Sequence, residues 1–201
     1  NKLKELGYKG RFVTFGSVFE MGETHEERFF TEEDVLTSTC PAPNDYTVSK
    51  RMLSSFVSSY KHDFTHWHFY IPTIYGAGEN PKRLIPYVIN AIRNGEELHF
   101  TAGDQTRQYV HVSEVPRMLA QAFDKNLPSG LYNIQGKETV TVKEIVTEIH
   151  HAMGKEVPDG CFGSVQRADV GMKYLALDGK KLHDATGFEA SIKITDVIDT
   201  Y

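Results

Sequence analysis

Residues 11–16 read Arg-Phe-Val-Thr-Phe-Gly, a short apolar run rich in β-forming side chains that ends at a glycine. Such a run predicts a β-strand. Asn44 and Asp45 are both typical N-cap residues, so a helix is predicted directly after them, over residues 46–61. Residues 66–70 predict a second strand. These three elements begin an alternation of strands and helices that decides the fold class.

The same alternation continues to the end of the chain. Residues 17–45 are predicted to be irregular, because this segment is acidic and ends with Pro41 and Pro43. Strands that alternate with helices are typical of an α/β protein with a largely parallel sheet. Further helices are predicted over 82–94, 114–123 and 142–153, with short ones near 180–184 and 195–200, and further strands over 98–101, 108–112, 131–134 and 174–177.

The composition is that of an ordinary globular protein. The 201 residues contain 40% hydrophobic and 24% charged side chains, which argues against a disordered or fibrous chain. The net charge of −5 offers no general attraction to phosphate backbones, so we expect no nucleic-acid partner. No apolar run reaches the roughly 18 residues that a membrane span needs. Only Cys40 and Cys161 are present, so we expect a reducing, cytoplasmic location without disulfides.

Residues 1–7, Asn-Lys-Leu-Lys-Glu-Leu-Gly, resemble the last turn of a helix that stops at a glycine. We therefore expect that the sequence is a fragment, or that its beginning is not included.

A histidine pair stands in the second predicted strand. His66 and His68 share one face of this strand because side chains alternate along it. Two histidines could begin a metal site, but a third ligand is not apparent. We therefore expect no metal.

Tyr46-Thr47-Val48-Ser49-Lys50 places a tyrosine and a lysine one helical turn apart on the same face. A phenol has a reference pKa of about 10, and a nearby ammonium favours the phenolate. Such a pair can therefore serve in acid–base chemistry. By itself the pattern also fits an ordinary exposed Tyr-Lys pair.

Three other segments stand in a fixed order around this pair: Ser17 to Gly22, Tyr70 to Gly76, and Thr101 to Val112. Together with the pair, they resemble the extended short-chain dehydrogenase/reductase family of nucleotide-sugar epimerases, dehydratases and reductases. The resemblance runs from Arg11 to the end of the chain.

This resemblance implies an α/β fold: the C-terminal part of a Rossmann-like parallel sheet plus a smaller mixed α/β substrate-binding region. Residues 1–75 would form the second part of the Rossmann-like domain, with the Ser/Tyr/Lys site. Residues 76–201 would mainly bind the nucleotide sugar. Residues 108–130 and parts of the late chain would pack back on the Rossmann-like sheet.

The resemblance also implies roles at the reacting centre. Ser17 would hold the reacting sugar oxygen, and Tyr46 would donate or accept the proton. Lys50 would bind the nicotinamide ribose and tune Tyr46. The cofactor would be NAD or NADP, bound by Tyr46, Lys50, Ile71 and Pro72. The helix that carries Tyr46 would form a homodimer interface.

Further residues would bind the nucleotide sugar. Arg107, followed two residues later by Tyr109, matches an arginine–aromatic pair of the family, and a guanidinium suits a diphosphate. Base recognition would involve residues 98–101. Tyr70 and Thr73 depart from the family's usual Arg and Asn, so the sugar is not identified. The substrate-binding set implied by the resemblance is Ser17, Thr73, Arg83, Leu84, Arg107, Tyr109, Arg167 and Asp169.

Two sequence motifs of the family are absent from this chain, and their absence narrows the choice of activity. Family dehydratases carry an Asp-Glu pair directly after the Ser/Thr, where this chain has Val18 and Phe19. A 4-keto reductase or a C4 epimerase of deoxysugar synthesis is therefore preferred. The glycine-rich dinucleotide fingerprint does not occur in the sequence. We expect that roughly 80–110 residues carry it in the complete protein.

The sequence leaves three functions open. The first is an NAD(P)-dependent oxidoreductase or epimerase that acts on a nucleotide-activated sugar by hydride transfer. The second is a non-catalytic nucleotide-sugar-binding module, or an inactive fragment without the dinucleotide loop. The third is a scaffold protein that binds no nucleotide sugar.

Overall fold

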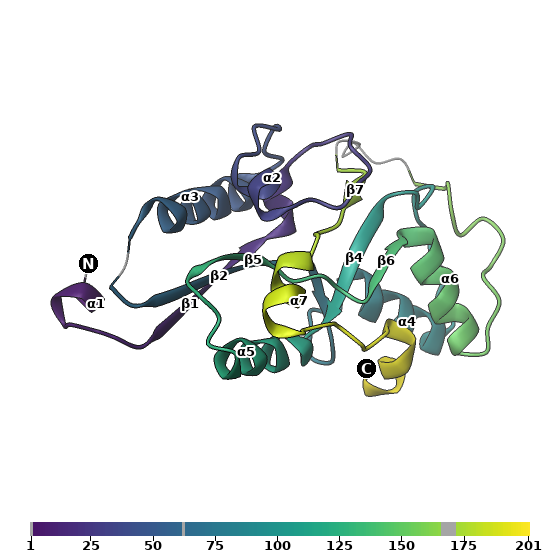
Figure 1. Cartoon of the computed structure of the whole chain (residues 1–201). Coiled ribbons are helices and arrows are strands. Elements are labelled where there is room, and N and C mark those ends of the chain that lie inside the picture. The colour runs from purple at the N-terminus through teal and green to yellow at the C-terminus, as the bar shows by residue number, and fades with distance from the viewer. Residues whose placement is uncertain (1, 62, 166–171) are drawn as a thin grey trace.

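The computed structural model describes residues 2–61, 63–165 and 172–201 (Figure 1). Its first sheet contains β1 (Arg11–Ser17), β2 (Thr65–Ile71) and β5 (Gly130–Asn133), in the order β1-β2-β5. All three strands are parallel. Ser17 is level with Ile71 across the β1–β2 pair, so the carboxyl ends of the two strands meet at one edge of the sheet.

The second sheet is mixed. Its central strand β4 (Thr106–His111) is parallel to β3 (Thr73–Tyr75) and β7 (Tyr174–Leu175) but antiparallel to β6 (Glu138–Thr141). Pro72 separates β2 from β3. Because proline has no N–H to donate, it interrupts strand pairing here, and the chain passes from the first sheet to the second.

Two helices cover opposite faces of the first sheet (Figure 1). The helix α3 (Asp45–Ser59) begins where Asn44 Oδ1 accepts the Thr47 N–H at 3.0 Å. The helix α5 (Glu114–Asp124) buries Met118 and Ala122 against the aromatic side chains of β2. The predicted strands 11–16, 66–70 and 131–134 and the predicted helices 46–61 and 114–123 are confirmed, with ends that differ by at most two residues.

The predicted helices 82–94 and 142–153 are present as α4 (Leu84–Asn94) and α6 (Val142–Ala152), and both pack in the apolar core beside the second sheet. The helix α4 ends at Gly95, which adopts φ 69° as a left-handed C-cap. It begins at Leu84 rather than at residue 82, because Arg83 is an extended N-cap residue. The remaining elements are α1 (Lys2–Glu5), η1 (Val18–Met21), α2 (Glu32–Leu36), α7 (Lys180–Thr186) and η2 (Ile194–Thr200).

Two local predictions are wrong. Residues 98–101 form no strand, and only a single bridge joins Phe100 to Phe162. Residues 17–45 are not wholly irregular, because they contain η1 and α2, each begun by a capping box. The short helix predicted near 195–200 is confirmed as the 3₁₀ helix η2. The short strands β3 and β6 were not predicted.

Among the described residues, no helix has the length and apolar character that a membrane span requires.

Candidate active site

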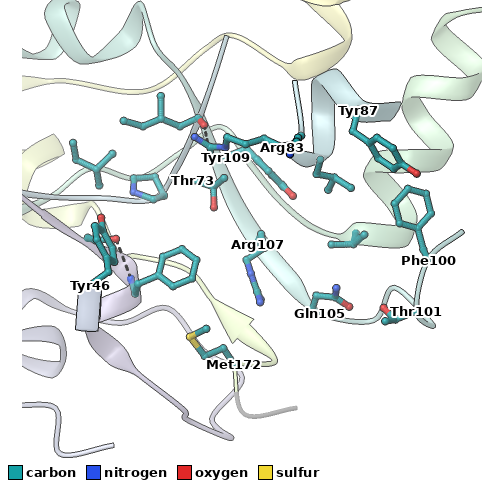
Figure 2. Close-up of a pocket in the computed structure, with 18 of the residues that line it drawn as sticks. Tyr46, Thr73, Arg83, Tyr87, Phe100, Thr101, Gln105, Arg107, Tyr109 and Met172 are labelled. Carbon is teal, nitrogen blue, oxygen red and sulfur yellow. Dashed lines mark hydrogen bonds between the residues drawn. The ribbon is translucent and has the colours of Figure 1, made fainter. Parts of the chain in front are cut away.

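A cavity of about 930 Å³ lies between the carboxyl ends of strands β1 and β2 in the first sheet and strand β4 in the second sheet. Figure 2 shows Tyr46 at one end, Tyr87 and Phe100 at the other, and Arg107 between them. Pockets of this size accommodate nucleotide-sized ligands. Among its lining residues are ten that the sequence singled out, namely Ser17, Tyr46, Lys50, Ile71, Pro72, Thr73, Arg83, Leu84, Arg107 and Tyr109. Arg167 and Asp169 lie outside the described residues.

Ser17 occupies the point where β1 ends and η1 begins. Its backbone is extended, with φ −145° and ψ 145°, and its Oγ accepts the Phe19 N–H at 3.3 Å. Its own N–H donates to Glu20 Oε1 at 2.7 Å. The strand end and the following turn therefore hold the serine on the cavity wall.

Tyr46 and Lys50 lie one turn apart on α3, as their spacing predicts, and both line the cavity. Tyr46 is half exposed, and its ring meets that of Phe19 edge-on at 6.5 Å. Lys50 Nζ lies 5.8 Å from the centre of the Tyr46 ring and donates to the Phe15 carbonyl at 2.8 Å. The ammonium has three donors, so this contact with Phe15 leaves donor capacity for a ligand.

The opposite wall of the cavity carries two guanidinium groups. Arg107 projects from β4, and its Nη1 donates to the Thr106 carbonyl at 2.7 Å. Arg83 Nε pairs with Glu79 at 3.1 Å, and its Nη2 donates to the Ile74 carbonyl at 2.9 Å. An anionic ligand would compete with Glu79 for Arg83. Burial raises the pKa of the Tyr109 phenol to about 12, so this side chain remains a neutral hydroxyl at physiological pH.

The far end of the cavity is aromatic, and sequence reasoning missed most of it. Tyr87 meets Phe100 edge-on at 6.2 Å, and Phe100 stacks on Phe162 at 5.8 Å. Tyr87 follows Arg83 by one helical turn, a spacing that could have placed it on the same wall. The predicted base-binding segment 98–101 contributes Phe100 and Thr101 to the lining, whereas two other lining residues, Gln105 and Met172, were not assigned. An aromatic wall suits a flat ring such as a nucleobase.

The histidine pair of β2 has a different environment from that of a metal site. Thr14 Oγ1 lies 2.9 Å from His66 Nε2 and 2.8 Å from His68 Nδ1. Among the residues that the structure describes, no three histidine, cysteine or acidic side chains are grouped as metal ligands would be.

Comparisons with known sequences identify a family and several relatives of this chain. A model of the NAD dependent epimerase/dehydratase family matches residues 2–134, which is more than half of the chain. A dTDP-glucose 4,6-dehydratase of Escherichia coli is 27% identical over 142 residues, which make up 65% of this chain and 37% of that relative. A CDP-abequose synthase of Salmonella muenchen is 26% identical over 87 residues, which make up 41% of this chain and 30% of that relative.

Solved structures show the same fold. A dTDP-glucose 4,6-dehydratase from Bacillus anthracis in complex with NAD superposes with a TM-score of 0.81 at 18% sequence identity. The matched region makes up 100% of this chain and 64% of the dehydratase chain. A UDP-glucuronic acid 4-epimerase from Bacillus cereus in complex with UDP-glucuronic acid and NAD superposes with a TM-score of 0.73 at 17% sequence identity. The matched region makes up 94% of this chain and 59% of the epimerase chain. The chain thus spans less than two thirds of the length of each of these relatives.

Proposed function

This chain belongs to the NAD dependent epimerase/dehydratase family, and from this premise we propose that the complete protein is an NAD(P)-dependent oxidoreductase or epimerase of a nucleotide-activated sugar. One observation carries the proposal. A single cavity presents Ser17, Tyr46 and Lys50 at one end, Arg107 in the middle and aromatic side chains at the other. This order matches a ligand with a reacting sugar, a central diphosphate and a flat base.

The cofactor end of the cavity fits a nicotinamide nucleoside. Lys50 offers N–H donors for ribose hydroxyls, and Ile71 and Pro72 supply an apolar wall level with Ser17. A bound nicotinamide would accept or supply the hydride. Several solved relatives, among them the two compared above, contain NAD. We propose the same class of cofactor for this chain, with NAD and NADP both open.

The proton that accompanies the hydride would pass through Tyr46. Its phenolate oxygen would take the proton of the sugar hydroxyl when the sugar carbon is oxidised, and the resulting phenol would return the proton on reduction. Lys50, on the next turn of α3, would favour the phenolate by its positive charge. Ser17 Oγ would hold the reacting sugar oxygen by a hydrogen bond.

The residues after Ser17 favour an epimerase or a 4-keto reductase over a dehydratase. Elimination of water needs an acid and a base beside the carbon atoms involved. The positions directly after Ser17 hold Val18, which is buried, and Phe19, which lines the cavity. Neither side chain transfers protons. This choice differs from the activity named for the Escherichia coli relative.

The experiment that tests the function incubates the full-length protein with a panel of UDP-, dTDP-, CDP- and GDP-sugars. Sugars with a C4 hydroxyl are given NAD or NADP, and 4-keto sugars are given NADH or NADPH as the hydride donor. Mass spectrometry and chromatography of the products should reveal an epimerised or reduced sugar and no loss of water. Binding without turnover would favour the non-catalytic binding module. The absence of both would favour the scaffold.

A second copy of this chain is the proposed partner at α3. Three large apolar side chains of α3, Val48, Met52 and Phe56, follow one another every four residues and are exposed, and this spacing places them in one stripe on the helix surface. The exposed ring of Tyr60, directly after the helix, lies 5.1 Å from that of Phe56 and extends the stripe. Pairing two such stripes removes both from water.

Replacing Phe56 by aspartate is expected to convert the dimer to a monomer, because it buries a charge in the proposed interface. Light scattering coupled to size exclusion measures the mass. A suitable control is Phe123→Asp, since Phe123 is 53% exposed against 57% for Phe56 but lies on α5, on the other face of the sheet. Equal masses for the Phe56→Asp variant and the wild type would contradict the interface.

A further inference from the structure

A buried carboxylate lies directly behind the proposed reacting centre. Glu20, in η1, is 0% exposed. Its Oε1 accepts the Ser17 N–H at 2.7 Å, and its Oε2 accepts the Ser54 hydroxyl at 2.6 Å. The roles proposed above for Ser17, Tyr46 and Lys50 make no use of this group.

The hydrogen bonds behind Glu20 are consistent with an ionised carboxylate. Burial lowers the pKa of His68 to about 4, so its ring is neutral and has one donor and one acceptor. Ser54 Oγ lies 2.9 Å from His68 Nε2, and His68 Nδ1 lies 2.8 Å from Thr14 Oγ1. When Ser54 donates to Glu20, its oxygen accepts from His68 Nε2–H, and Nδ1 then accepts from Thr14. Every donor in this chain points toward the carboxylate.

The surrounding charges also act on this group. Burial raises the pKa of Glu20 above its usual value, and the hydrogen bonds from Ser54 and Ser17 and the positive charges of Lys50 and Arg51 offset only part of this rise. Both cations belong to α3. Arg51 Nε also donates to the Glu20 carbonyl at 2.7 Å, so the backbone of η1 is fixed from the same helix.

The end of β1 leaves room for the carboxylate. A Cβ at Gly16 would lie 2.6 Å from Glu20 Oε1 and 2.7 Å from His68 Nε2. Only glycine avoids these contacts. The glycine at position 16 therefore leaves the space that the Glu20 carboxylate occupies.

Similar capping boxes elsewhere in the chain lie at the surface. In α2, Asp34 Oδ2 accepts the Thr31 N–H at 2.8 Å, and in α6, Glu144 Oε2 accepts the Thr141 N–H at 2.7 Å. Both of these acidic residues are much less buried than Glu20. A helix cap does not need burial, and removing a carboxylate from water is costly unless it is paired and hydrogen-bonded. The burial of Glu20 therefore points to a role beyond capping.

We propose that Glu20 is a positioning residue of the active site, which clamps the backbone of Ser17 and attracts the ammonium of Lys50 from behind the cavity wall. This inference rests on the proposed function. Glu20 does not touch the substrate. It fixes where the Ser17 hydroxyl stands and helps to hold Lys50 beside Tyr46.

Two variants separate these effects in the full-length protein. Glu20→Gln keeps an oxygen for the Ser17 N–H but removes the charge, and kcat is expected to fall about tenfold while KM changes by less than about threefold. Glu20→Ala removes the clamp as well, and kcat is expected to fall about 100-fold. The assay uses the panel sugar that the wild type converts.

The control variant is Asp34→Asn, which weakens a capping box outside the cavity and should leave kcat unchanged. A Glu20→Gln variant with the kcat of the wild type would overturn the charge role. So would equal effects of the Glu20→Gln and Asp34→Asn variants.

Amide hydrogen exchange measured by NMR tests the clamp without any substrate. The Ser17 amide is expected to exchange slowly in the wild type and in Glu20→Gln, and at least about tenfold faster in Glu20→Ala. Fast exchange of the Ser17 amide in the wild type would contradict the proposal that Glu20 holds the Ser17 backbone, and this result does not require that either variant folds. If the wild type converts no sugar in the panel, the proposed function fails, while the amide measurement still decides whether Glu20 holds Ser17.

Discussion

Replacing Tyr46 by phenylalanine is expected to reduce turnover of the nucleotide sugar by about 10²- to 10⁴-fold, the usual contribution of a general acid–base group. The substitution removes only the hydroxyl. The Tyr46 ring contacts Phe19 edge-on, and this contact is preserved in the variant. Binding of the cofactor and of nucleoside diphosphates should therefore change by less than about threefold.

Steady-state kinetics together with calorimetry separate the two effects. Tyr8→Phe is the matched control, because Tyr8 also loses a hydroxyl, one that donates to the Arg11 carbonyl at 2.8 Å, and lies outside the cavity. Its turnover should equal that of the wild type. Near-normal turnover of Tyr46→Phe would contradict the acid–base role of Tyr46.

Replacing Arg107 by alanine is expected to weaken the binding of UDP or dTDP by about 10- to 100-fold, as expected for loss of a charge-assisted hydrogen bond. Arg107 lies between the two ends of the cavity, where a diphosphate between sugar and base would lie (Figure 2). Arg107→Lys keeps the charge but loses the planar pair of donors, so its affinity for UDP or dTDP should lie between that of the wild type and that of Arg107→Ala. Titration calorimetry at one fixed ionic strength measures all three.

The control for this series is Arg93→Ala. Arg93 is a cation on α4 whose Nη2 donates to the Ile198 carbonyl at 3.4 Å, outside the cavity. Its loss should leave the nucleotide affinity unchanged. If Arg107→Ala and Arg93→Ala bind UDP and dTDP equally well, the diphosphate does not contact Arg107.

The long elements of the fold could be predicted because local sequence determines them. The strand β1 has an uninterrupted run of β-forming side chains, and α3 has a cap residue directly before it. The strands β3 and β6 also contain β-forming side chains, but with three and four residues they are too short to be recognised from the sequence. They form because β4 lies between them, and pairing across a sheet depends on residues far apart in the chain. The segment 98–101 has strand-like composition, but Phe100 N–H donates to the Cys161 carbonyl of a loop.

The two sides of the candidate site were not equally predictable. Tyr46 and Lys50 share one helical turn, so their proximity follows from helix geometry. At the aromatic end, Tyr87 of α4 meets Phe100 of a loop, and Phe100 in turn stacks on Phe162 of a second loop; only the tertiary structure brings them together. The acidic composition around Glu20 indicated an irregular segment and gave no sign that this one side chain is buried.

The most direct test of the central claim is hydride transfer in the full-length protein. A nucleotide sugar that the panel identifies as substrate or product, carrying a hydroxyl and a deuterium at C4, is incubated with the oxidised cofactor and an excess of protein. The reaction is stopped within a single turnover, before the hydride returns to the sugar, and the reduced nicotinamide is analysed by mass spectrometry. We predict deuterium in the nicotinamide for the wild type and its near absence for Tyr46→Phe. A sugar that is converted without any label reaching the nicotinamide would contradict the central claim.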